Sequence, residues 1–157
     1  MRLEAWRIVK ARHAPEAFSG EGPRRYGGRW TSPGVAVVYA AEHASLAVLE
    51  MLVHLGSSGL LPSYVITRCE FDPKWTERIS ADDLPREWRV SPPLQSLRAI
   101  GDRWVSEGRS AVLDVPSAVL PIERNFLLNP GHADFKRVLV GEPQAFAFDP
   151  RLGRRAA

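Results

Sequence analysis

The sequence contains one cysteine, Cys69, among 157 residues. A single thiol cannot form an internal disulfide bond or a thiolate metal cluster, so it fits a reducing compartment, where we expect it to fill core space. No run of about 18 apolar residues is present, and the first ten residues are mixed and charged rather than basic and then apolar. We therefore expect a cytoplasmic protein with neither a membrane span nor a secretory signal.

The common nucleotide and zinc signatures are missing too. The sequence has no G-x-G-x-x-G after a predicted strand, no G-x-x-x-x-G-K-S/T, no C-x-x-C and no H-E-x-x-H. It also shows no internal repeat. The composition, with 45% hydrophobic and 25% charged residues, is typical of one globular domain spanning residues 1–157, and we expect residues 150–157 to form a flexible tail.

The net charge is small, at +3, although the sequence pI is about 9.4. A basic balance can attract nucleic acid or phosphorylated ligands, whereas scattered arginines usually form a solvated surface. The one local concentration, Arg24 and Arg25, precedes Arg29 in a segment rich in glycine and proline. It would place positive potential beside that residue.

Hydrophobic periodicity and breakers predict a mixed α+β chain rather than a regular alternation of strands and helices. Loops are expected over residues 11–28 and 72–92 and in the stretch NFLLNPGH. The predicted strands are Ala5–Val9, Val35–Tyr39, Ser63–Phe71, Ala111–Val115, Arg137–Gly141 and Ala145–Phe148, and the predicted helices are His43–Leu55 and Pro93–Gly108.

The first of these helices carries one carboxylate, Glu50, beside its apolar residues, and Gly56 marks its end. An unpaired buried carboxylate costs several kcal/mol, so a cation should lie near it, and Arg29 in the upstream turn is the obvious candidate. The pair has two interpretations: a structural link between loop and helix, or part of a functional site. The stripe that Glu50 borders consists of Leu46, Leu49, Leu52 and Val53.

Three further polar residues stand at element ends or on predicted strands. Ser117 follows Pro116 just beyond a predicted strand, a position where sheets often present functional side chains, although a serine there is ordinarily a turn residue. Asn125 lies in the predicted NFLLNPGH loop, where asparagine side chains commonly bond to the backbone. Arg7, in the first predicted strand, is either a ligand contact or a surface arginine.

Two long stretches resemble one known family. GGRWTSPG, followed by VVY and SLAVLE, and the downstream VPSAVLPIERNFLLNPGHADF are similar to the RES-domain proteins, bacterial toxins named for an Arg, a Glu and a Ser. Position by position, these letters are Arg29, Glu50 and Ser117. The sequence departs mildly from the family pattern at Thr31, often Asn, and at Ala133, often Pro.

The resemblance implies an ADP-ribosyltransferase-like α+β fold, with a split β-sheet core and flanking helices around a cleft for NAD, the substrate, and no metal. Family members degrade NAD by hydrolysis or phosphorolysis, or transfer ADP-ribose to a protein. The implied catalytic residues are Arg29, Tyr39, Glu50 and Ser117, and the implied NAD-binding residues are Arg7, Arg29, Tyr39 and Asn125.

These residue types suit cleavage of the bond between nicotinamide and ribose. Arginine offers a planar fork of donors to a pyrophosphate, tyrosine a flat face to a ring, and serine a hydroxyl to another ligand oxygen. Glutamate stabilises positive charge on the sugar. Nicotinamide leaves as a neutral molecule, so no general acid is needed and one carboxylate suffices.

The resemblance also implies a partner: an antitoxin that joins a DNA-binding region to a segment blocking the active site, in a hetero-oligomer. In this interpretation the chain itself does not bind nucleic acid. The alternative of another class is a binding protein without turnover, in which Arg24, Arg25 and Arg29 contact nucleic acid or an acidic partner. The complete set of Arg29, Tyr39, Glu50 and Ser117 favours the enzyme.

Overall fold

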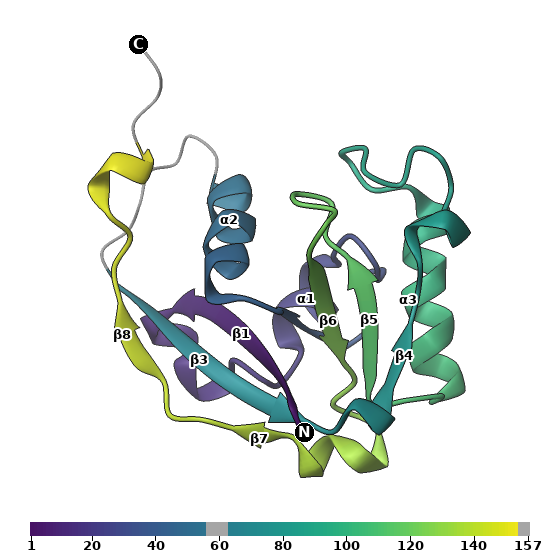
Figure 1. Cartoon of the computed structure of the whole chain (residues 1–157), viewed down its shortest axis with the longest axis horizontal. Helices are drawn as coiled ribbons and strands as arrows, with labels where there is room; N and C mark the ends of the chain where they lie inside the picture. The colour runs from purple at the N-terminus through teal and green to yellow at the C-terminus, as the bar shows by residue number, and fades with distance from the viewer. Residues whose placement is uncertain (56–62, 154–157) are drawn as a thin grey trace.

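The computed structural model describes residues 1–55 and 63–153 (Figure 1). The longer helices flank one sheet, and short 3-10 turns join several strands. No helix in these two ranges is long and apolar enough to cross a membrane. The strands are β1 (Leu3–Lys10), β2 (Val38–Ala41), β3 (Tyr64–Phe71), β4 (Thr76–Arg78), β5 (Val112–Pro116), β6 (Arg124–Leu128), β7 (Leu139–Val140) and β8 (Gln144–Phe146), and the α-helices are α1 (Glu21–Tyr26), α2 (Ala44–Leu55) and α3 (Gln95–Glu107).

The strands follow the order β4-β5-β6-β2-β1-β3-β7, and β8 also pairs with β3. Among the strands of the described residues, β4 and β5 run parallel and the other pairs are antiparallel. β1 pairs with β3 along its whole length, but it meets β2 at a single pair, Trp6 opposite Ala41. The sheet is therefore split between β1 and β2, and both the α+β class and the split sheet are confirmed.

Each half of the sheet is covered by its own helix (Figure 1). α2 packs through Leu46 on Ile8 of β1 and on Tyr64 of β3. α3 packs through Leu97 and Trp104 on the strands of the other half. Because the helices stand on different halves, the split between β1 and β2 lies between them.

The close contact between α3 and the turn that carries Trp30 depends on a glycine of the helix. A Cβ atom added to Gly101 would lie 1.9 Å from the carbonyl oxygen of Trp30, so only glycine allows the helix to approach this turn. Trp30 itself is buried, at 2% exposure, against the same helix. α3 ends as expected at Gly108, whose φ of 60° is the left-handed conformation that favours glycine.

Several predicted elements differ from the structure because long-range pairing decides them. Arg124–Leu128, predicted as part of a loop, forms β6 between β5 and β2. The strand predicted over Val35–Tyr39 begins later and runs to Ala41. The predicted loops also contain short elements: α1 and a 3-10 turn within residues 11–28, and β4 within residues 72–92.

Other boundaries moved by a few residues, and the predicted stripe of α2 is only partly buried. The last two predicted strands are shorter, as β7 and β8. In α2, Leu46 is fully buried, but Leu49 and Val53 are 40% and 62% exposed. Gly56, residues 57–62 and residues 154–157 lie outside the described ranges, and the first part of the expected tail, Pro150–Gly153, forms a 3-10 turn.

Candidate active site

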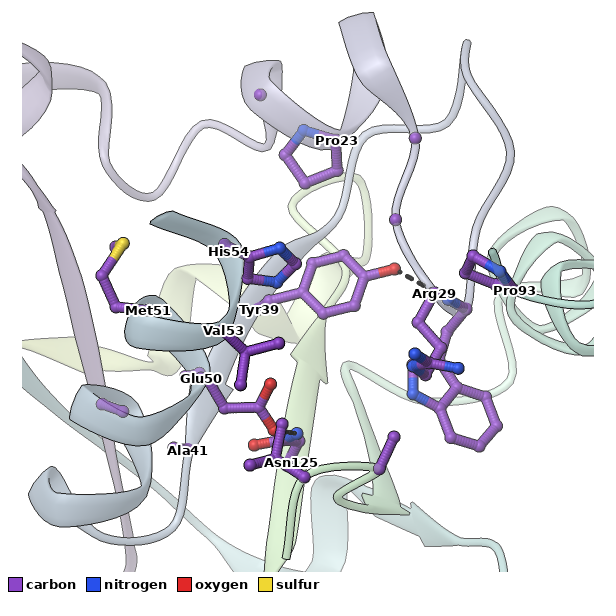
Figure 2. Close-up of a pocket in the computed structure, with 18 of the residues that line it drawn as sticks. Pro23, Arg29, Tyr39, Ala41, Glu50, Met51, Val53, His54, Pro93 and Asn125 are labelled. Atoms are coloured by element: carbon purple, nitrogen blue, oxygen red, sulfur yellow. Dashed lines mark hydrogen bonds between the residues drawn. The ribbon is translucent and has the colours of Figure 1, made fainter. Parts of the chain in front are cut away.

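A cavity of about 980 Å³ opens where the sheet splits. Its walls come from β1, β2, α2, the turn that carries Arg29, the segment around Arg89 and the β5–β6 hairpin. Figure 2 shows Glu50 and Asn125 side by side at one end of it, with Arg29 across from them. Of the sequence-predicted residues, Arg7, Arg29, Tyr39, Glu50 and Asn125 line this cavity.

Glu50, on α2, is held by two donors that meet the same carboxylate oxygen. The Ser117 hydroxyl donates to Glu50 Oε1 at 2.7 Å, and the Asn125 amide Nδ2 donates to Oε1 at 2.7 Å. Within the described residues, no hydrogen bond reaches the second oxygen, Oε2. One oxygen is therefore fixed by the protein and the other is left for a ligand in the cavity.

Ser117 reaches the site indirectly. Its side chain is fully buried, and its neighbours Ala118 and Val119, rather than Ser117 itself, line the cavity. The hydroxyl oxygen accepts from the amides of Val119, at 3.1 Å, and Leu120, at 3.0 Å, while it donates to Glu50. All of its hydrogen-bonding capacity is used, so the geometry gives Ser117 the task of orienting Glu50, where a direct contact with a ligand oxygen was expected.

Arg29 and Glu50 do not form the structural ion pair that the sequence left open. The Arg29 guanidinium donates from Nη1 to the carbonyl oxygens of Trp88, at 3.2 Å, and Val90, at 2.8 Å. In the described ranges, no carboxylate oxygen lies within 4.0 Å of it. Burial lowers the pKa of Arg29, and the negative charge of Glu50 opposes that shift. The two groups therefore attract each other across the cavity without direct contact.

Tyr39 is fixed by its hydroxyl. The hydroxyl oxygen accepts from the Trp30 amide at 3.2 Å and shares a hydrogen bond of 2.9 Å with Thr31 Oγ1. A Cβ on Gly28 would lie 2.5 Å from this hydroxyl, so glycine is required where the turn passes Tyr39. Burial raises the pKa of Tyr39 to about 12, which keeps the phenol neutral at physiological pH.

Arg7 enters the cavity from β1, and its hydrogen-bond acceptors within the described ranges are two backbone carbonyl oxygens. Nε donates to the carbonyl oxygen of Ala17 at 2.6 Å and Nη1 to that of Tyr39 at 2.8 Å. Burial lowers the pKa of Arg7 to about 10, so the guanidinium remains charged at neutral pH. A buried positive charge that has only carbonyl dipoles as partners favours an anionic ligand in the cavity.

Sequence reasoning missed two other arginines of the cavity. Arg89 donates from Nε to the carbonyl oxygen of Ala118 at 2.9 Å, and Arg98 of α3 donates to that of Gly28 at 3.0 Å. With Arg7 and Arg29 they make four guanidinium groups around one cavity, and Glu50 is the single acidic residue among the described residues that line it. None of the four forms an ion pair in the part of the chain that the structure describes. Their positions in the sequence are far apart, so no local pattern could have grouped them.

The remaining polar residues of the NFLLNPGH stretch have local roles. Asn129 Oδ1 accepts from the Gly131 amide at 3.0 Å, and His132 Nδ1 accepts from the Asp134 amide at 3.0 Å. Among the described residues, one group has metal-ligating atoms close together, within 4.8 Å of one another: Glu42, His43 and Glu123. None of these three residues lines the cavity.

The family of this chain follows from its sequence as well as from this site. The family model described as RES domain matches residues 4–149. The chain belongs to the RES domain family. Toxin Res of Yersinia enterocolitica is 38% identical over 148 residues, which cover 94% of this chain and 97% of the relative. The Prs ADP-ribosylating toxin of a Sphingobium species is 36% identical over 161 residues, covering 99% of this chain and all of the relative.

The fold is also shared with a solved structure, a chain of the M. tuberculosis MbcT–MbcA toxin–antitoxin complex. The TM-score is 0.72 at 16% sequence identity, and the match covers 98% of this chain and 87% of that chain. The expected ADP-ribosyltransferase-like α+β fold is thereby confirmed. This RES domain chain therefore resembles proteins named as toxins over nearly its whole length.

Proposed function

We propose that this RES domain chain is the toxin of a toxin–antitoxin pair and cleaves the nicotinamide–ribose bond of NAD in the cytoplasm, depleting NAD by hydrolysis or phosphorolysis. The observation that carries this proposal is the charge pattern of the cavity. Four arginines that have no carboxylate partner among residues 1–55 and 63–153 surround one carboxylate, Glu50, whose orientation is fixed by two hydrogen bonds. This pattern suits a ligand with a diphosphate and one centre that becomes cationic.

The cavity suits NAD in size and in lining. Its volume of about 980 Å³ is at the upper end of the range typical of small-molecule sites. Arginine guanidinium groups form charge-assisted and often bidentate hydrogen bonds with phosphate oxygens. Arg7 and Arg29 would hold the diphosphate, and Tyr39 would offer its ring to a heteroaromatic ring or a ribose.

Glu50 would act through electrostatics. As the bond from the ribose C1′ to nicotinamide breaks, its electron pair goes to the nicotinamide nitrogen, which becomes neutral, and positive charge spreads over C1′ and the ring oxygen. Glu50 Oε2 would stabilise that charge, while Ser117 and Asn125 hold Oε1, so the carboxylate need not reorganise during the reaction. The nucleophile that then bonds to C1′ decides the product. Water gives ADP-ribose, and phosphate gives ADP-ribose with a phosphate on the same C1′ carbon.

A second candidate is transfer of ADP-ribose to a specific protein. The relative named as a Prs ADP-ribosylating toxin favours it, because the match covers that protein completely. In that reaction a protein side chain replaces water as the nucleophile at C1′, while the tasks of Arg29, Tyr39 and Glu50 are unchanged. The two candidates therefore differ in what can reach the mouth of the cavity.

The binding-module alternative has less support. Arg24, which it needs for contact with nucleic acid, pairs with Glu21 at 2.8 Å. Arg25 lies 3.8 Å from the same carboxylate. The positive potential of this segment is therefore partly cancelled by its own helix, and DNA binding is better assigned to the antitoxin.

The antitoxin would cover the cavity mouth. Tyr26 and Val53 both line the cavity and are 79% and 62% exposed. Large apolar side chains exposed beside a polar cavity often mark a surface that a protein partner covers. The solved relative of similar fold comes from a toxin–antitoxin complex, which supports a hetero-oligomer in which an antitoxin segment blocks access to Glu50.

The test follows NAD directly. The purified chain is incubated with NAD in phosphate-free buffer and in phosphate buffer, with Glu50→Gln as the matched variant, and products are identified by mass spectrometry. Nicotinamide release by the wild type alone supports the proposal, and the second product separates hydrolysis from phosphorolysis. Growth arrest on induction with intact NAD and a modified protein would establish the transferase. No nicotinamide release and no modified protein would refute both enzymatic candidates.

A further inference from the structure

The two residues between β2 and α2, Glu42 and His43, contact the hairpin that joins β5 to β6. Glu42 ends the β2 side of this junction and His43 directly precedes α2. Neither lines the cavity. Glu42 contacts Arg124, the first residue of β6, and His43 contacts Glu123, the residue before it. Asn125 directly follows these two residues.

Glu42 forms hydrogen bonds with both main-chain polar groups of Arg124, its amide and its carbonyl. The Glu42 amide donates to the Arg124 carbonyl oxygen at 3.1 Å, and Glu42 Oε1 accepts from the Arg124 amide at 2.7 Å. Asn125, whose amide fixes Glu50 Oε1, is the next residue. The Glu42 contacts therefore extend the β2–β6 ladder, in which Ala41 pairs with Asn125, by one residue and hold the backbone directly before Asn125.

His43 adds a second contact to the same hairpin. Its Nδ1 lies 2.7 Å from Glu123 Oε1. The carbonyl oxygen of Glu123 in turn accepts from the Ser117 amide at 3.0 Å. His43 precedes Glu50 by seven residues, and both contact the hairpin or the strand that follows it, His43 through Glu123 and Glu50 through Ser117 and Asn125.

The hairpin cannot easily move to compensate for a lost contact, because its other side is anchored. Arg124 donates from Nε to Asp114 Oδ1 at 2.5 Å and from Nη2 to the carbonyl oxygen of Ile79 at 2.6 Å. Its guanidinium therefore ties β6 to β5 and to the residue after β4. With this anchor in place, the Glu42 and His43 contacts add to the β2–β6 ladder in holding the start of α2 against the hairpin.

We propose that Glu42 and His43 form a clasp on Glu123 and Arg124 that positions Glu50. The clasp keeps α2 at the distance from the hairpin at which the Ser117 hydroxyl and the Asn125 amide both reach Glu50 Oε1. Glu42 is the main positioning residue, because its carboxylate is mostly buried, with 26% of the side chain exposed, whereas the His43 side chain is 60% exposed. This inference rests on the proposed role of Glu50 in NAD cleavage.

The first test compares Glu42→Ala with Glu42→Gln. Alanine removes the acceptor for the Arg124 amide, whereas glutamine keeps an oxygen in its place. Small displacements of a positioned group cost up to about 100-fold in rate, so we expect Glu42→Ala to lower kcat for NAD about tenfold. KM should stay within about twofold, because the residue does not line the cavity, and Glu42→Gln should restore most of the rate. A role in folding alone would give no such division between kcat and KM.

His43→Ala is the milder variant, and His13→Ala is its matched control. His13 also pairs with a glutamate, Glu16 at 3.0 Å, but it lies in an exposed turn away from the hairpin. We expect His43→Ala to lower kcat a few-fold and His13→Ala to leave it unchanged. If Glu42→Ala does not fold, the comparison of these two variants tests the clasp by itself.

A second measurement does not require turnover. Hydrogen exchange at the Val119 and Leu120 amides, which bond to the Ser117 hydroxyl, should be faster in Glu42→Ala than in the wild type and Glu42→Gln. If the wild type releases no nicotinamide, the proposed function fails, while faster exchange would still establish the clasp. An active Glu42→Ala with unchanged kcat and unchanged exchange at these amides would overturn the clasp and leave the proposed function standing.

Discussion

The Ser117 hydroxyl oxygen lies 2.7 Å from Glu50 Oε1 and makes no contact with the cavity. The serine is buried at the end of β5, whereas the glutamate belongs to α2 on the other side of the split sheet. Their hydrogen bond therefore connects the hairpin half of the site to the helix half. We therefore expect Ser117 to act as a positioning residue, whose loss affects the proposed reaction more than the binding of substrate.

Ser117→Ala tests this role. The change removes one of the two donors to Glu50 Oε1, so the carboxylate gains freedom, and we expect kcat for NAD to fall about 10- to 100-fold with KM nearly unchanged. It also leaves the half-buried amides of Val119 and Leu120 without their acceptor, which should lower the free energy of unfolding by about 1 kcal/mol. Steady-state kinetics and urea denaturation measure the two effects separately. An increase in KM as large as the fall in kcat would instead mean that the serine contacts NAD.

Arg29→Ala separates binding from stability at the opposite wall. Loss of the guanidinium removes a charge-assisted contact to the diphosphate, so we expect NAD affinity to fall at least about tenfold. Affinity is best measured by calorimetry on the Glu50→Gln background, because that variant should not consume the ligand. Arg103→Ala is the matched control, since Arg103 is exposed on α3 and lies outside the cavity. A lower melting temperature with unchanged affinity would show that Arg29 serves only to hold the carbonyl groups of Trp88 and Val90.

The sequence could predict residues whose roles are encoded locally. The turn of Arg29, the helix of Glu50 and the position of Ser117 after a strand all have local signals, namely glycines, a helical period and a proline. The full arrangement could not be predicted. β6 reads as a loop from its own residues, and it becomes a strand only because β5 and β2 flank it.

The same limit applies to the cationic side of the cavity. Arg89 contacts the hairpin at Ala118, and Arg98 contacts the turn at Gly28. Each partner is distant in sequence from its arginine. In α2, a helical period cannot tell a side that packs on the sheet from one that faces a partner. Leu49 and Val53 carry the apolar pattern of a core yet are exposed.

Cys69 predicts a loss of stability at alkaline pH. Burial raises the pKa of this thiol from 9.0 to about 12 in the folded protein. The unfolded chain therefore releases its proton first, so stability is full below pH 9 and falls as pH rises from about 9 toward 12. Tyr39, whose pKa is raised from 10.0 to about 12, adds a loss of the same sign above pH 10. Urea denaturation across this range measures the fall, and Cys69→Ala should remove the part that begins near pH 9 and leave a shallower one above pH 10. An equally steep fall in Cys69→Ala would assign the alkaline loss to other groups.

A further prediction concerns Gly101, which allows α3 to pack closely on the turn that carries Arg29. A methyl group at this position would lie 1.9 Å from the Trp30 carbonyl oxygen, which belongs to the backbone and cannot rotate away. Gly101→Ala should therefore push the turn outward and lower the free energy of unfolding by about 1–3 kcal/mol, the usual cost of overpacking. Gly131→Ala is the matched control, because the nearest atom to a Cβ there, Asn129 Oδ1, is at an ordinary contact distance of 3.4 Å and Gly131 does not line the cavity. Since the displaced turn carries Arg29 and bonds to the Tyr39 hydroxyl, NAD affinity should fall together with stability in Gly101→Ala, and a stable variant with full affinity would contradict the close packing of α3 on the site.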